Sequence, residues 1–397
     1  MKKALFVATV SGFLDSFEIS DISLLQSLEY QVHCACNLRG ETSDSDQARL
    51  RETGAVLHQI DFTRSPLSAA NRGAYRQLRR LMADESFDLV HCHTPVGGML
   101  GRLAARKARV PEVLYTAHGF HFFHGAPLKN WLLFYPLEQI MSRCTDLLIT
   151  INSEDERLAR KRSHAKRVER IHGVGLDIRR FSDCQVDREK KRAELGVGRE
   201  EILLLSVGEL DDVKNHITVL QAMETLAPKG FRYLIAGDGG LMEAHQAFLR
   251  ERHLDQAVQL LGYRRDIPEL LRAADIYVFP SLREGLSVSL MEAVAAGLPV
   301  ACSPIRGNVD LVLDPRSYFN PRDPAEAASV LERLAALPES EKRRLAAVNR
   351  ENLKSYDFSQ VRREMTAIYR IADEAVRNKK AAKETSEKTF TGKEGSR

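Results

Sequence analysis

The sequence predicts an α/β protein of two domains, each built on a parallel β-sheet. Short apolar runs that suit buried strands alternate with helical patterns along most of the chain, and its 397 residues suffice for two domains of ordinary size. The clearest unit joins a strand at Ile276–Phe279 to a helix at Val288–Ala296, which Gly297 ends, and to a strand at Pro299–Cys302. Units of this kind are the building blocks of parallel sheets.

The composition is that of a soluble globular protein in a reducing compartment. Hydrophobic residues make up 44% and charged residues 28% of the chain, while the net charge of +4 does not indicate a nucleic-acid partner. The six cysteines form no C-x-x-C pair and are expected as free thiols. No apolar run approaches the roughly 20 residues that span a bilayer, and the first apolar run lacks a cleavage site. We therefore expect a cytoplasmic protein, or one peripheral on the inner face of the plasma membrane.

The first domain is expected to span residues 1–178. A turn at Ser11–Gly12 should end its first strand, and Asp44–Asp46 is expected in a solvated loop rather than in a metal-binding D-x-D motif. The expected strands are Ala4–Val10, Gln31–Ala35, Phe87–Cys92, Glu112–Thr116 and Asp146–Ile151. The expected helices are Ile19–Leu28, Asn71–Ala83, Pro95–Lys107, Trp131–Met141 and one that Ser153 caps.

The second domain is expected to span residues 179–357. A helix over 358–376 should follow it, and the polar residues 377–397 should form a disordered tail. Before the central unit, the expected strands are Glu201–Val207, Phe231–Ala236 and Val258–Leu261, and Asp310–Leu313 is the element expected after it.

Two carboxylates, Glu284 and Glu292, flank the start of the central helix. Open α/β sheets bind ligands at the carboxyl ends of their strands, and the backbone N–H groups near Leu286 and Ser287 can receive a phosphate. Glu284 could then accept hydrogen bonds from a sugar and Glu292 from a ribose diol. Alternatively, Ser289 and Glu292 form an S-x-x-E capping box and Glu284 is an ordinary solvated charge. The two carboxylates alone leave both interpretations open.

The run LGYRRDIPELLRAADIYVFPSLREGLSVSLMEAVAAGLPVACS resembles the donor-binding core of the retaining glycosyltransferases of family 4, whose mark is E-x7-E. The resemblance covers about residues 1–375 and implies the GT-B fold, in which two Rossmann-like domains face a cleft. It also implies that Glu284 contacts the donor sugar, Glu292 the ribose, and the helix start at Gly285, Leu286 and Ser287 the phosphates.

Three basic residues are candidates for binding the donor diphosphate. The loop GELDDVKNH aligns with a family motif whose lysine holds the diphosphate, which implies that role for Lys214. Most family members carry arginine where this chain has Glu209. Arg264 or Arg306 could supply the missing positive charge, and the sequence does not decide between them.

Two residues of the first domain complete the predicted site. Gly12 would allow close approach of the backbone to the donor, and family members often carry glycine there. His118 lies in TAHGFHF, which resembles the bacterial exopolysaccharide branch of the family, where a histidine contacts the donor sugar. The implied catalytic residues are thus Glu284, His118 and Lys214. Five of the twelve histidines fall between His91 and His124, but none has a recognisable zinc spacing, so we predict no metal site and no metal cofactor.

The resemblance implies a glycosyltransferase that retains the anomeric configuration, and the available cations predict that it needs no metal. Its donor would be a UDP-sugar carrying a hexose or N-acetylhexosamine, and its acceptor a lipid-linked saccharide of a growing surface polysaccharide. The basic stretch Arg157–Arg170 and the apolar Trp131–Met141 would bind an anionic membrane surface, or would be a solvated face and a core helix. The rival functions are a sugar-nucleotide epimerase of the same fold and a non-catalytic sugar-nucleotide-binding protein, which Glu209 makes conceivable.

Overall fold

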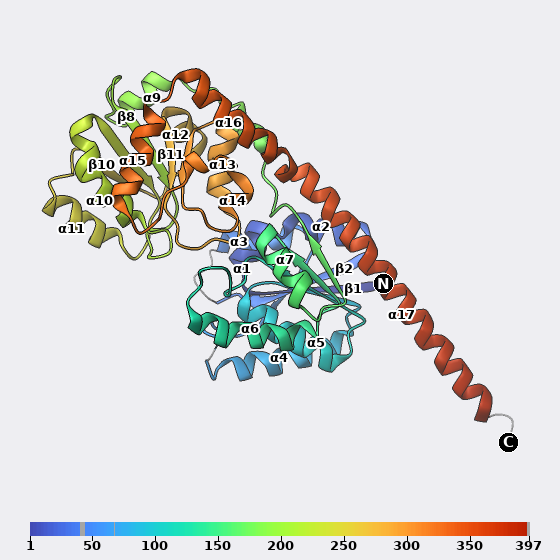
Figure 1. Ribbon diagram of the computed structural model, residues 1–397. Coiled ribbons are helices and arrows are strands. Elements are labelled where there is room, and N and C mark those ends of the chain that lie inside the picture. Colours follow the sequence, from blue (N-terminus) through green and yellow to red (C-terminus); the bar gives the residue numbers. More distant parts are fainter. Residues whose placement is uncertain (40–43, 67, 395–397) are drawn as a thin grey trace. The chain divides into compact units, whose positions relative to one another are not determined.

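A computed structural model divides the chain into two compact units (Figure 1). The first comprises Met1–Val174 and the chain from Val361 onward, and the second comprises Gly175–Gln360. The predicted boundaries were 178 and 357. The structure describes residues 1–39, 44–66 and 68–394, and of residues 44–45 and 386–394 it describes the backbone alone.

The first unit is built on a seven-stranded, wholly parallel sheet in the order β3-β2-β1-β4-β5-β6-β7. The strands are β1 (Lys2–Val10), β2 (Tyr30–Asn37), β3 (Val56–Gln59), β4 (Leu89–Cys92), β5 (Glu112–Ala117), β6 (Leu147–Thr150) and β7 (Arg167–Arg170). Residues Ala4–Ala8 of β1 are fully buried, as expected for a central strand covered on both faces. The strand order reverses between β1 and β4, so the loops that follow these two strands flank the switch point.

Helices cover both faces of this sheet, with α4, α5 and α6 on one side and α17 on the other (Figure 1). The helices are α1 (Ser11–Phe17), α2 (Ile19–Ser27), α3 (Asp44–Glu52), α4 (Asn71–Glu85), α5 (Pro95–Ala108), α6 (Leu128–Ser142), α7 (Ser153–Arg162) and α17 (Phe358–Glu394). Among the described residues, no helix combines the length and the apolar character needed to cross a membrane.

Several local predictions for the first unit are corrected. The turn expected at Ser11–Gly12 is the first turn of α1, which follows β1 directly. Asp44–Asp46, expected in a loop, opens α3, while residues 41–43 lie outside the described residues. The basic stretch 157–170 is divided between α7 and β7. Both β3 (VLHQ) and β7 (RVER) escaped prediction because these edge strands are only four residues long and contain few apolar residues, too few for a clear period.

The disordered tail predicted from residue 377 is also corrected, because α17 continues to Glu394. Its polar side chains bind the amino-terminal edge of the sheet instead of a core. The Lys379 ammonium donates to a Glu112 carboxylate oxygen at 2.5 Å, and the Lys380 ammonium lies 2.5 Å from an Asp88 carboxylate oxygen. Ion pairs with residues far away in the sequence therefore hold the part of the helix that lies beyond its apolar stripe.

The second unit is built on a five-stranded parallel sheet in the order β10-β9-β8-β11-β12. Its strands are β8 (Ile202–Val207), β9 (Phe231–Ala236), β10 (Val258–Gly262), β11 (Ile276–Phe279) and β12 (Val300–Cys302). Its α-helices are α8 (Ile178–Ser182), α9 (Arg188–Glu194), α10 (His216–Leu226), α11 (Met242–Glu251), α12 (Ile267–Ala273), α13 (Val288–Ala296), α14 (Asn308–Leu311), α15 (Pro324–Ala335) and α16 (Glu339–Leu353). The order reverses between β8 and β11. The predicted fold class, two Rossmann-like parallel-sheet domains, is confirmed.

We predict that Asp373 anchors α17 to the first unit. Its buried carboxylate accepts from the Lys2 ammonium at 2.6 Å, the Tyr30 hydroxyl at 2.9 Å and Arg377 Nε at 2.9 Å. Asp373→Ala should lower the free energy of unfolding by about 2–3 kcal/mol, because three donors lose one acceptor. Chemical denaturation measures this. Glu374→Ala, at the exposed neighbouring position, should change it by less than about 0.5 kcal/mol; equal stability of both variants would contradict the anchor.

Candidate active site

The loops after β8 and β11 meet at the switch point of the second sheet. Their strands are hydrogen-bonded neighbours, and parallel α/β sheets bind ligands at such a point. Two hydrogen bonds tie the loops together. The Leu282 N–H donates to the Val213 carbonyl at 2.8 Å, and the Asn215 side-chain amide donates to the Pro280 carbonyl at 3.0 Å. The fold thus fixes the relative position of the two loops.

Lys214 and Glu284, predicted from separate motifs, form an ion pair across these loops. Lys214 Nζ lies 2.7 Å from Glu284 Oε1, although the residues are 70 positions apart. The Lys214 N–H also donates to an Asp211 carboxylate oxygen at 2.7 Å, and its ammonium lies 5.2 Å from the centroid of the Phe279 ring. The side chains are 21% and 14% exposed, so a ligand can still reach the charges.

Glycines of the loop after β9 allow it to pack against the backbone of the loop that carries Lys214. A Cβ added to Gly237 would lie 1.8 Å from the Gly208 carbonyl oxygen, and one added to Gly239 would lie 2.6 Å from the Leu210 carbonyl oxygen. Only glycine permits this backbone contact. Gly208 in turn lies beside the Lys214 side chain. The GDGG run after β9 therefore supports the loop that carries Lys214.

Helix α13 begins at the Glu284 loop, and its N-cap decides between two interpretations of Glu292. The N-cap is Ser287, whose hydroxyl accepts from the Leu290 N–H at 3.3 Å. Glu292 therefore lies past the third helical position, and the alternative capping box of Ser289 with Glu292 does not form. No hydrogen bond engages the Glu292 side chain within the described residues. Burial raises its pKa to about 7, while the nearby Arg180 opposes the shift.

The predicted residues of the first unit lie at the carboxyl edge of its own sheet. Gly12 is in the first turn of α1, directly after β1, and His118 follows β5. The His118 ring packs edge-on against Phe13, with ring centroids 4.9 Å apart, and burial lowers its pKa to about 4. His118 also lies beside His93, one of the five clustered histidines, and beside Glu18, which the sequence patterns missed. Glu18 lies 100 positions before His118, and only the fold brings them together.

Two family models match the chain. One described as Glycosyl transferase 4-like matches residues 3–152, and one described as Glycosyl transferases group 1 matches residues 187–351. A protein of Bacillus subtilis (strain 168) named glycosyltransferase EpsD is 35% identical over 376 residues, covering 93% of this chain and 96% of that protein. The chain belongs to the family 4 glycosyltransferases.

Two further comparisons agree with this assignment. An Escherichia coli protein named UDP-Gal:alpha-D-GlcNAc-diphosphoundecaprenol alpha-1,3-galactosyltransferase is 30% identical over 303 residues, covering 74% of this chain and 76% of that enzyme. The crystal structure of Anabaena Alr3699/HepE in complex with UDP and glucose superposes with a TM-score of 0.73 at 18% identity, covering 93% of this chain and 99% of that one. This structural likeness bears on the fold, which is GT-B.

In the glycosyltransferase, Glu209 is exposed in the loop after β8. Of the two arginines considered as replacements, Arg306 lies at the site: its Nε donates to the Glu284 carbonyl at 2.8 Å. Arg264 instead binds the Asp266 carboxylate through two hydrogen bonds, of 2.7 and 2.5 Å. The structure thus brings Lys214, Glu284 and Arg306 together, whereas Arg264 is held by its own loop.

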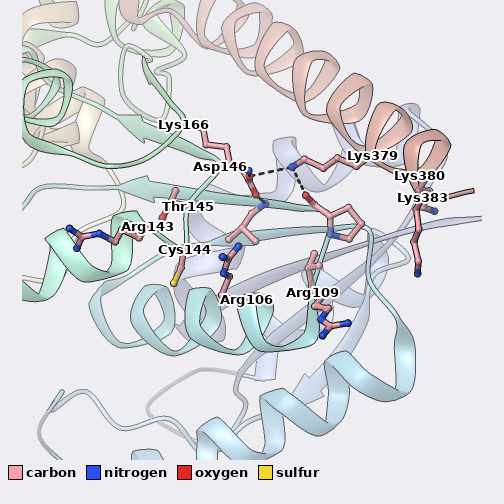
Figure 2. Close-up of a pocket in the computed structure, with 13 residues that line it drawn as sticks. Arg106, Arg109, Arg143, Cys144, Thr145, Asp146, Lys166, Lys379, Lys380 and Lys383 are labelled. Carbon is pink, nitrogen blue, oxygen red and sulfur yellow. Dashed lines mark hydrogen bonds and ion pairs between the residues drawn. The ribbon is translucent and has the colours of Figure 1, made fainter. Parts of the chain in front are cut away.

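A concave region of the enzyme lies at the amino-terminal edge of the first sheet, opposite the edge that carries Gly12 and His118 (Figure 2). It is a cavity of about 580 Å³ at the starts of β5, β6 and β7. Seven cationic side chains line it: Arg106, Arg109, Arg143, Lys166, Lys379, Lys380 and Lys383. Within the described part of the chain, the side chains of Arg106 and Arg109 have no ion-pair or hydrogen-bond partner. Asp146 is the one acidic side chain among the described lining residues.

We predict that Ser287 supports α13 while Glu292 destabilises the fold. Ser287→Ala should lower the free energy of unfolding by about 1 kcal/mol, because an N-cap acceptor is lost. Glu292→Gln should raise it at pH 8. The folded chain holds the Glu292 proton up to a pKa of about 7, against 4.5 for an ordinary glutamate, so stability falls as the pH rises through this window.

Thermal melts of the wild type and both variants at pH 5 and pH 8 measure these effects. The gain from Glu292→Gln should be present at pH 8 and largely absent at pH 5. A lower melting temperature of Glu292→Gln at pH 8 would mean that the carboxylate supports the helix after all.

Proposed function

We propose that this enzyme transfers a sugar from a UDP-sugar to a lipid-linked saccharide of a growing surface polysaccharide, with retention of configuration and without a metal cofactor. The observation that carries the proposal is the Lys214–Glu284 ion pair beside the start of α13. The name of the Escherichia coli relative, which specifies a UDP-sugar donor and a diphosphoundecaprenol-linked acceptor, supports the choice of substrates. Contacts other than this ion pair would determine which sugar is transferred, a hexose or an N-acetylhexosamine.

In this proposal the ion pair rearranges when the donor binds. The diphosphate competes with Glu284 for the Lys214 ammonium, and the backbone N–H groups of Leu286 and Ser287 at the start of α13 would bind the same charge. The Glu284 carboxylate is then released to accept hydrogen bonds from the sugar. Arg306, bound to the Glu284 carbonyl, keeps the loop in place meanwhile. Glu292 accepts hydrogen bonds from the ribose diol.

Catalysis would then rest on stabilising the departing diphosphate. Lys214 and the helix start are fixed dipoles and charges that need little reorganisation as negative charge develops, and such groups supply a large part of many rate enhancements. Since Glu284, once released from Lys214, accepts hydrogen bonds from the sugar, we assign it no role as nucleophile. A donor phosphate oxygen would assist the incoming hydroxyl on the same face, which retains the configuration.

A screen of UDP-sugars with a diphosphate-linked lipid saccharide as acceptor tests this function. UDP release that requires both substrates supports transfer. Formation of an epimeric UDP-sugar without acceptor would support an epimerase, and donor binding without turnover in any combination would support a non-catalytic protein.

We predict that Glu284→Gln lowers kcat by about 100- to 1,000-fold with little change in KM, because the charge is needed more in the transition state than in the ground state. Steady-state kinetics on the best donor measures it. Glu243→Gln, which removes an exposed carboxylate of α11, is the matched control and should retain wild-type turnover. Turnover of Glu284→Gln near the wild-type value would refute its assignment.

An enzyme with a lipid-linked acceptor must bind its substrate at a membrane surface, and α6 has an exposed apolar face that suits such a surface. Its inner side chains, Trp131 and Tyr135, pack against Phe122. On its outer face, Leu128 is 72% and Leu132 70% exposed, and Leu133 and Ile140 are also exposed. The inner face therefore fits the interpretation of this segment as a core helix, and the outer face fits its interpretation as a membrane-binding surface. Because α6 leads directly to Arg143 in the cationic cavity, we propose that apolar and cationic groups bind an anionic bilayer together.

The basic stretch 157–170 contributes less to this surface than its composition suggests. Arg160 pairs with Glu156 at 2.9 Å, Lys166 with Asp146 at 2.5 Å, and Arg167 with Glu169 at 2.5 Å. Internal carboxylates thus already neutralise these cations, whereas Arg106 and Arg109 have no such partner among the described residues.

We predict reversible binding to vesicles of anionic phospholipid, weakened by salt. The double substitution Arg106→Gln and Arg109→Gln should weaken it by about 2 kcal/mol, roughly 30-fold, and Leu128→Ser with Leu132→Ser should also weaken it. The matched control, Arg160→Gln with Arg167→Gln, should have a smaller effect. Co-sedimentation with vesicles measures all three. Binding that is unaffected by lipid charge and by these substitutions would refute the surface.

A further inference from the structure

Glu18, His93 and His118 converge at the carboxyl edge of the first sheet. Glu18 lies between α1 and α2, His93 follows β4, and His118 follows β5. The side chains of Glu18 and His93 are 4% and 1% exposed, and that of His118 is 23% exposed. His93 Nδ1 lies 3.2 Å from Glu18 Oε1 and 3.3 Å from His118 Nε2, while His118 Nε2 lies 4.0 Å from Glu18 Oε1.

These three separations are those of ligand atoms around a tetrahedral ion. Zinc binds nitrogen and carboxylate oxygen at about 2.0–2.2 Å, which places neighbouring ligand atoms about 3.3–3.5 Å apart. The separations of 3.2 and 3.3 Å lie within about 0.1 Å of this range, and the third, 4.0 Å, would close by about half an ångström. Two histidines with one glutamate also form a ligand set that zinc accepts with one position left open.

One hydrogen bond at His93 Nδ1 cannot serve both of its neighbours. This atom carries either one proton or one lone pair, yet it lies within hydrogen-bond distance of both Glu18 and His118. A cation between the three atoms would use the lone pairs of all of them at once.

The surrounding packing fixes these ligands and limits their number. The His93 ring stacks on Phe6, with centroids 5.8 Å apart, and His118 packs edge-on against Phe13. The adjacent His91 cannot join, because its two nitrogens bind the Tyr369 hydroxyl at 2.9 Å and the Thr116 hydroxyl at 2.8 Å. Three ligands therefore face one point.

The charges nearby favour a cation. Glu18 is accompanied by the half-buried carboxyl of Asp21, and their mutual repulsion adds to the cost of burying Glu18 in its charged form. Asp21 accepts from the Tyr369 hydroxyl at 3.0 Å and is attracted by Arg362. A divalent ion beside Glu18 would offset this concentration of buried acid.

We propose that Glu18, His93 and His118 form a binding site for a divalent transition-metal ion such as Zn²⁺, and that occupation inhibits the enzyme by withholding His118 from the donor sugar. The inhibitory part rests on the proposed sugar transfer and on the donor contact that the family resemblance implies for His118, whereas the binding part does not. The His93 Nε2 atom has no partner in the described structure, so a bound ion lacks one outer-shell contact. We therefore expect an affinity about 10- to 100-fold below that of a fully supported site.

The binding test uses the full chain stripped of metal with EDTA. Calorimetric titration with Zn²⁺ should give one ion per chain, and Co²⁺ should produce the strong visible absorption of a tetrahedral complex. Glu18→Gln and His93→Asn should remove both signals. The control His124→Asn changes an exposed histidine that follows β5, as His118 does, and should retain them. Absence of the Co²⁺ spectrum in the wild type would overturn the site even if the variants failed to fold.

The activity test follows UDP release on the best donor. Transfer should persist in EDTA, Zn²⁺ should inhibit it at the concentrations that titrate the site, and Glu18→Gln should lose this sensitivity. Zinc binding without any loss of turnover would overturn the inhibitory role. Should no donor be turned over at all, the function proposed for the chain fails while the metal titration still decides the site.

Discussion

The candidate site depends on the reversal of strand order between β8 and β11. Neighbouring parallel strands whose connections leave in opposite directions must place their following loops side by side, and side chains on those loops then meet without any local sequence signal. Here the consequence is the Lys214–Glu284 ion pair. The backbone contact at Gly237 fixes the Lys214 loop, and the Arg306 hydrogen bond fixes the Glu284 loop. The first sheet repeats the arrangement, and its reversal between β1 and β4 brings Gly12 and His93 to one edge.

The paired charges have an energetic role in the absence of ligand. A partly buried ammonium and a partly buried carboxylate each cost free energy to desolvate, and each offsets the cost of the other. The pair keeps both groups in place until a diphosphate exchanges with the carboxylate. Glu292 lacks such a partner among the described residues, which is why burial raises its pKa. A group that costs stability is common where binding, rather than folding, has determined the residue.

Local signals predicted some elements accurately. Helix α13 has the predicted bounds, Val288–Ala296, because a serine caps one end and Gly297, at a positive φ, ends the other. Elements that depend on distant partners were missed. The C-terminal extension of α17 is held by Glu112 and Asp88, which no pattern within residues 377–394 reveals.

The same distinction applies to the site. The roles of Glu284, Glu292 and Lys214 came from a motif and a resemblance, and the structure adds that Lys214 and Glu284 touch. The choice between Arg264 and Arg306 needed coordinates, because it depends on which arginine is already bound by a neighbouring carboxylate. Glu18 had no sequence signal at all, since its partners lie on two other strands.

The central claim is that the switch-point loops of the second unit bind a nucleotide diphosphate, and calorimetric titration with UDP tests it most directly. The wild type should bind UDP, and Lys214→Met should weaken binding by about 1.5–3 kcal/mol through the loss of a charged hydrogen bond. Arg264→Met removes a cation that Asp266 already binds, so the UDP affinity of this variant should stay within a factor of about two of the wild-type value. Undiminished UDP affinity of Lys214→Met, in a chain that melts like the wild type, would contradict the account.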